Sequence, residues 1–114
     1  MEKIKIGNEA VFEVEIINSQ KKLEEGLSGR KIICANCGML FEFGNIGQHS
    51  FWMKGMKFDL DILWILKGEI VYIAKNTSYS SKETITPRVE SDKVLEINAG
   101  MADKLGVKIG DRLE

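Results

Sequence analysis

The sequence has little of what several functional classes require. It contains one histidine, one proline and two cysteines among 114 residues. No stretch approaches the roughly 20 consecutive apolar residues that cross a bilayer, and no GxxxxGK loop is present to hold phosphates. The formal net charge of −1 gives no general attraction for polyanions, so we expect neither a nucleic acid nor a membrane as partner.

The start of the chain also lacks the continuous apolar run of a signal peptide. Charged and apolar residues alternate in MEKIKIGNEAVFEVEI, which predicts a cytoplasmic protein; an export signal already removed from a precursor would leave no trace here. A length of 114 residues with 44% hydrophobic residues is typical of one globular domain. We therefore expect a single domain over residues 1–114 that is soluble and monomeric.

What the sequence does contain is mostly strand pattern. Phe12, Val14 and Ile16 alternate with glutamates at period two, as in a strand with one buried face. Lys67-Gly68 has the length and the glycine of a two-residue hairpin turn. The strands expected on these grounds are 3–6, 12–16, 39–43, 50–54, 59–66, 69–75 and 93–97.

Helical signals are short. Helices are expected only at about 20–25, after Ser19 and before Gly26, and at 101–105, with Gly106 as a left-handed cap. The polar segment 76–92 reads as a long connection, a kind of loop that often carries function. Many strands without long helices between them predict a mainly β fold, a single-domain antiparallel β-sandwich or barrel of jelly-roll-like type.

The cysteines form the motif Cys34-Ala-Asn-Cys37, half of a typical zinc site. His49 could be a third ligand, yet four ligands are usual and no second cysteine pair exists. Thioredoxin-like chemistry needs such a motif at a helix N-terminus, whereas this one precedes a strand. We favour two reduced thiols or a local disulfide in a turn, and we expect no metal and no cofactor.

The most apolar stretch is FWMKGMKFDLDILWI, residues 51–65. If it starts as a strand, Trp52 and Lys54 share one face. Asp61 stands where the opposite face of the next strand changes from polar to apolar, so its carboxylate needs water or a donor. The expected partners are Lys54, Arg30 and Arg88, either in a salt bridge that fixes strand register or at the edge of a cavity.

Four motifs in order carry a resemblance to a known family. GLSGR (residues 26–30), GMLFEF (38–43), FWMKGMKFDLDILWI and VLEINAGMADKLGVKIGDRL (94–113) resemble the pattern GLM-x-R, GMLF, FWMKNT with PLDILFI, and VLE-x-x-AG with a closing GD. This is the pattern of the uncharacterised family called domain of unknown function 192 (DUF192). The resemblance implies a compact β-sandwich or barrel, no established activity and no cofactor.

The sequence keeps some of the family's residues and changes others. The retained residues are Arg30, Trp52, Lys54, Asp61 and Asp111. By contrast, Gly55-Met56 stands where the family usually has Asn-Thr, and Asp59 stands where it has proline. The cysteine pair falls in a variable stretch.

Three functional hypotheses follow. The first is a binding module in which Trp52, Lys54, Asp61, Arg30 and Asp111 hold a small polar ligand such as a sugar. The second is a protein-interaction or accessory domain with an exposed apolar surface near Trp52. The third is a hydrolase using Asp61 with Asp59 or Asp111 as acid and base; no catalytic motif is recognised, so an enzyme is the least favoured.

Overall fold

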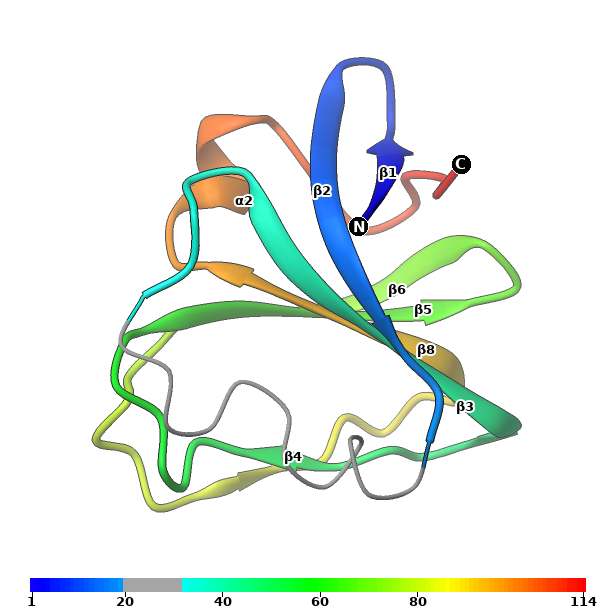
Figure 1. Ribbon diagram of the computed structural model, residues 1–114. Helices are drawn as coiled ribbons and strands as arrows, with labels where there is room; N and C mark the ends of the chain where they lie inside the picture. Colours follow the sequence, from blue (N-terminus) through cyan, green and yellow to red (C-terminus); the bar gives the residue numbers. More distant parts are fainter. Residues whose placement is uncertain (20–31) are drawn as a thin grey trace.

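The computed structural model describes residues 1–19 and 32–114 (Figure 1). The helix expected at 20–25 lies outside these residues. The described elements are β1 (Glu2–Ile6), β2 (Ala10–Ile17), β3 (Cys37–Gly47), β4 (Phe51–Trp52), β5 (Leu60–Leu66), β6 (Glu69–Thr77), β7 (Thr84–Ile85), β8 (Ser91–Asn98) and α2 (Met101–Lys104).

Six of the strands form one sheet in the order β1-β2-β3-β8-β5-β6, and β4 pairs with β7 in a second, two-stranded sheet. The prediction of a mainly β fold is confirmed. The large sheet is mixed and not purely antiparallel, because β2 and β3 run parallel. The chain between Ile17 and Cys37 is long enough for the crossover that a parallel pair needs.

The C-terminal residues join the two edges of the large sheet. The N–H groups of Lys5 and Glu114 each donate to the other residue's carbonyl, at 2.8 and 2.7 Å, and Leu113 N–H donates to the Gly68 carbonyl at 2.7 Å. These bonds reach β1 on one side and the β5–β6 turn on the other, so the sheet curls into a barrel. The C-terminus lies at this seam, and both chain ends lie in the upper right part of Figure 1.

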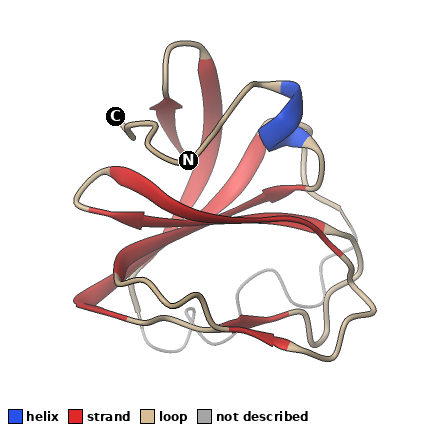
Figure 2. Cartoon of the chain, turned by 180° about the vertical axis from the view of Figure 1, so that it is seen from behind, coloured by secondary structure: helices blue, strands red, loops and turns tan. Residues whose placement is uncertain are grey.

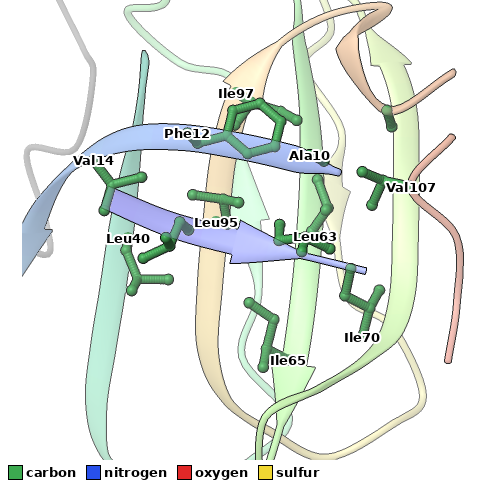
Figure 3. Packing of buried hydrophobic residues seen from close by; sticks show 13 residues of the cluster. Ala10, Phe12, Val14, Leu40, Leu63, Ile65, Ile70, Leu95, Ile97 and Val107 are labelled. Atoms are coloured by element: carbon green, nitrogen blue, oxygen red, sulfur yellow. The ribbon is translucent and has the colours of Figure 1, made fainter. Parts of the chain in front are cut away.

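One apolar cluster fills the barrel. It comes from β1, β2, β3, β5, β6 and β8, with Val107 added from the segment after α2, and Figure 3 shows these side chains pointing toward one another. Phe12, Leu63 and Leu95 are all fully buried within it. Strand β5 is buried on both faces, as expected from its apolar sequence.

A second apolar cluster lies on the outer face of the same sheet, where the small β4–β7 sheet covers it. Phe41, Trp64 and Met53 are members, and Phe51 and Ile85 of the small sheet pack against it. Figure 2 shows the two short strands lying beneath the large sheet. The small sheet and its connections are therefore held to the barrel by apolar contact.

The local turn predictions are confirmed. Lys67 and Gly68 adopt φ of 50° and 81°, which is the double left-handed conformation of a two-residue hairpin. Helix α2 makes one turn, and Gly106 follows it with φ of 69°. The expected strand at 50–54 is shorter, because the chain turns after Trp52.

Two glycines of β3 test the packing of this sheet. A Cβ on Gly38 would lie 2.8 Å from the Glu96 carbonyl oxygen of β8, whereas a Cβ on Gly44 would meet nothing within 4 Å. Because backbone cannot move aside without disturbing the β3–β8 pairing, we expect Gly38→Ala to lower the free energy of unfolding by about 1–3 kcal/mol. Gly44→Ala should be neutral or stabilise by about 0.4–1 kcal/mol. Urea denaturation of both variants measures this; equal stability of the two would contradict the packing described.

Candidate functional site

Asp61 lies on β5 with its side chain fully buried, at 0% exposure. Its Oδ1 accepts a hydrogen bond from Asn76 N–H at 2.8 Å, and its Oδ2 accepts one from Ala102 N–H at 2.9 Å. In the described part of the chain neither Lys54 nor Arg88 forms an ion pair with it. Two backbone donors, one for each oxygen, satisfy a carboxylate that the sequence led us to expect beside a cation.

Asp59, two residues earlier, acts on the same connection. Its Oδ1 accepts the Tyr79 N–H at 2.9 Å. Asn76, whose N–H is held by Asp61, takes a left-handed φ of 51°, a conformation that asparagine tolerates better than most residues. The two aspartates therefore fix the end of β6 at residue 76 and the start of the connection to β7 at residue 79.

The following serines fold this connection into a tight turn. Ser78 is its centre: its Oγ accepts the Ser80 N–H at 3.2 Å, and its carbonyl accepts the Ser81 N–H at 3.0 Å. Ser81 Oγ in turn accepts the Glu83 N–H at 3.3 Å. The segment that the sequence presented only as a long polar connection is thus held in one shape by its own side chains.

The facing wall comes from β4 and the turn after it. Met56 N–H donates to the Met53 carbonyl at 3.0 Å, and Gly55 takes φ of 79°. Glycine and asparagine are the residues that best accept this conformation, which gives a backbone reason for Gly55 standing where the family usually has asparagine. The turn means that Lys54 does not share a strand face with Trp52; instead its Nζ lies 5.2 Å from the centre of the Trp52 ring.

These two walls enclose a groove of about 420 Å³. Trp52 and Tyr79, which are 55% and 54% exposed, provide its aromatic rings. The wall segments are joined at their base, because Trp52 pairs with Thr84 of β7 and the Ser50 and Thr86 hydroxyls lie 2.8 Å apart. The described lining residues are Trp52, Met53, Lys54, Gly55, Tyr79, Ser80, Ser81 and Lys82.

The structure gathers only part of the residue set that the sequence suggested for ligand binding. Trp52 and Lys54 line the groove, and Asp61 lies behind it as a support for the connection. Asp111 is elsewhere, in the turn that leads to the C-terminal seam, where its Oδ2 accepts the Lys108 N–H at 3.0 Å. Arg30 lies outside the described residues.

The cysteines and the histidine serve the local structure. Cys34 and Cys37 form a disulfide within one turn, which was one of the two favoured interpretations. The His49 ring stacks on Phe43 with centroids 3.8 Å apart, and its carbonyl accepts the Trp64 indole N–H at 2.8 Å. Within residues 1–19 and 32–114, no group of three histidine, cysteine or acidic side chains is placed to hold a metal ion.

Glu96 is the feature that the sequence interpretation missed. It lies on β8 between Met39 and Ile62 of the neighbouring strands and is only 4% exposed. Burial raises the pKa of its carboxyl to about 8, and no described residue forms a hydrogen bond or ion pair with it. The signal available in the sequence was a carboxylate within the apolar run VLEI, two residues after Val94 and so on the face that the outer apolar cluster covers.

The fold and this geometry can now be compared with known proteins. Residues 2–114 match the DUF192 family, described as an uncharacterised ACR. The chain therefore belongs to the DUF192 family, as its motifs indicated. A comparison with curated proteins finds no match. No helix within the described residues is long and apolar enough to cross a membrane.

Two solved structures are similar over almost the whole chain. One, from Sinorhizobium meliloti, is named as a proposed transcription regulator; it is 34% identical, with a TM-score of 0.93 over 98% of this chain and 91% of that one. The other, from Novosphingobium aromaticivorans, is called a protein of unknown function; it is 27% identical, with a TM-score of 0.92 over 98% of this chain and 83% of that one. These likenesses support the fold and leave the activity open.

The role of Asp61 is tested by Asp61→Asn. An amide keeps one acceptor oxygen but turns an NH₂ group toward the second backbone donor, which loses its partner inside the protein. We expect the free energy of unfolding to fall by about 1–3 kcal/mol in urea denaturation. Asp59→Asn is the matched control, since its amide oxygen can still accept the Tyr79 N–H and the side chain is exposed; it should change stability by less than about 0.5 kcal/mol. Similar losses in both variants would contradict this role.

The raised pKa of Glu96 should make the free energy of unfolding depend on pH. The folded protein keeps the Glu96 proton up to about pH 8, whereas the unfolded chain releases it near pH 4.5. Between these values the folded state binds more protons, so this residue makes the free energy of unfolding fall as pH rises, by at most about 1.4 kcal/mol per pH unit. Glu96→Gln should flatten the curve in this window and be more stable than wild type near pH 8. Parallel curves for the two proteins would rule this out.

Proposed function

We propose that this domain is a binding module whose groove between Trp52 and Tyr79 holds a small polar ligand such as a sugar. The observation that carries the proposal is the placement of two half-exposed aromatic rings in one groove with serines and lysines beside them. Aromatic faces cover the C–H surfaces of a sugar ring, while hydroxyl and ammonium groups meet its polar edge.

The rigidity of the walls supports the same proposal. Asp59, Asp61 and Ser78 already hold the connection that bears Tyr79, so little conformational freedom remains to be lost on binding. Less ordering of loops and side chains leaves more of the contact energy as affinity.

A protein-interaction domain is the second candidate, because Trp52 and Tyr79 are exposed and exposed aromatic residues are frequent in interfaces. The hollow between them favours a ligand that enters over one that lies flat. The Sinorhizobium relative is named as a proposed transcription regulator, yet a net charge of −1 lends no support to DNA binding here.

A cytoplasmic location and a monomeric state stay predictions.

A hydrolase built on Asp61 is not proposed. Both of its oxygens accept backbone hydrogen bonds, and its side chain has no exposed surface from which to reach a substrate. General acid–base catalysis requires the carboxyl group within hydrogen-bonding reach of the reacting atom.

The proposal predicts that a sugar in a panel of monosaccharides and disaccharides raises the melting temperature of the wild-type protein. Trp52→Ala should abolish the shift, since sugar stacking on this ring is lost, and Trp52→Phe should retain part of it because an aromatic face remains. Ile109→Ala, which removes a remote exposed apolar side chain, is the control and should behave as wild type. A panel without any shift, or a shift that survives Trp52→Ala, would contradict the proposal.

A further inference from the structure

The described charged side chains that line the groove are both cationic. Its described lining includes two cations, Lys54 and Lys82, and no acidic side chain. The chain as a whole is nearly neutral, with a net charge of −1. The described lining of the groove therefore carries positive charge on a protein that does not attract anions generally.

We propose that the ligand of this groove is an anionic saccharide, a sugar ring that carries a carboxylate or phosphate group. The inference rests on the proposed function and specifies its ligand class. Trp52 and Tyr79 contact the ring, Lys54 lies beside it, and Lys82 meets the anionic substituent.

Lys54 is placed for this role by its turn. Gly55, at φ of 79°, completes the turn that brings the Lys54 ammonium to 5.2 Å from the Trp52 ring centre. A ring stacked on Trp52 would thus have a positive charge at its side. The aromatic surface and the charge act on adjacent parts of one ligand, which favours a molecule that has an apolar face and an anionic group close together.

Lys82 lies on the other wall, directly after the serine turn. The ion pairs of the described chain join Lys75 to Asp103, Lys93 to Asp92, Lys108 to Asp111 and Arg112 to Glu69. Lys82 takes part in none of them. Its charge is accordingly not offset by a carboxylate of the described residues, and it can pair with an anion that enters the groove.

The serine turn provides the hydroxyl groups that a sugar needs. Ser80 and Ser81 line the groove, and Ser78 holds their backbone N–H groups. The Ser80 and Ser78 hydroxyls lie 2.8 Å apart, so each has a defined partner. Fixed hydroxyls next to a lysine suit the ring hydroxyls and the charged substituent of one saccharide.

The carboxylate and the phosphate share this chemistry, and a binding experiment separates them. Calorimetry and Trp fluorescence are run with glucose, glucuronate, glucose 6-phosphate and inorganic phosphate as probes. We expect at least one of the two anionic sugars to bind about fivefold to thirtyfold more tightly than glucose. This preference should disappear at about 1 M salt, where charges are screened beyond about 3 Å.

Variants assign the preference to the groove. Lys82→Gln should remove most of the preference for the anionic sugar, so that the affinity for the anionic sugar falls more than the affinity for glucose. Lys57→Gln makes the same change in net charge at an exposed lysine outside the groove lining and should keep the preference.

Three results would contradict the inference. Equal binding of glucose and the anionic sugars, unaffected by Lys82→Gln, overturns the inference but leaves the proposed function standing. Inorganic phosphate that binds as tightly as glucose 6-phosphate also overturns it, because the ring would then contribute nothing. No binding by any probe, with a negative sugar panel, overturns both.

Discussion

The buried Asp61 carboxylate ties two separate segments, the end of β6 and the start of α2, to strand β5. From a strand buried on both faces, it accepts one N–H at the end of β6 and one in the first turn of α2. The first bond sets the start of the connection that forms one wall of the groove. The second holds α2, after which the chain places Val107 in the barrel core and closes the seam between β1 and the β5–β6 turn. An ionised group in an apolar interior is costly unless its acceptors are filled, so this bond pair constrains both segments.

The groove is a product of connections and not of the barrel itself. Its walls are the turn after β4 and the serine turn before β7, and the small sheet that joins them is held to the barrel by the outer apolar cluster. Binding residues on loops that a rigid sheet supports are a common arrangement. A turn residue such as Gly55 can also change without affecting the core, so one fold can carry different groove linings.

Sequence pattern predicted what depends on local periodicity and turn chemistry: most of the strands, the Lys67-Gly68 hairpin and the C-terminal turn with Gly106. It did not predict what depends on distant backbone. The sequence suggested cations as partners of Asp61. Its actual partners are backbone N–H groups, and since nearly every residue has one, the sequence does not indicate which of them will donate. The parallel pairing of β2 and β3 joins segments that are distant in the chain, and the burial of Glu96 follows from the strands on either side of it. Trp52 could be predicted as a site residue because an aromatic side chain close to a lysine is recognisable in the sequence itself. Tyr79 could not, because its position in the groove depends on the hydrogen bonds of Asp59 and Asp61.

The proposed ligand site is the groove between Trp52 and Tyr79. The most direct test is an NMR titration of ¹⁵N-labelled protein with the best-binding sugar of the panel. We predict that shift changes concentrate on the Trp52 indole N–H and on the backbone N–H groups of Gly55 and residues 79–82, with the buried Trp64 indole unchanged. Saturable shifts confined to another face of the barrel would contradict this account.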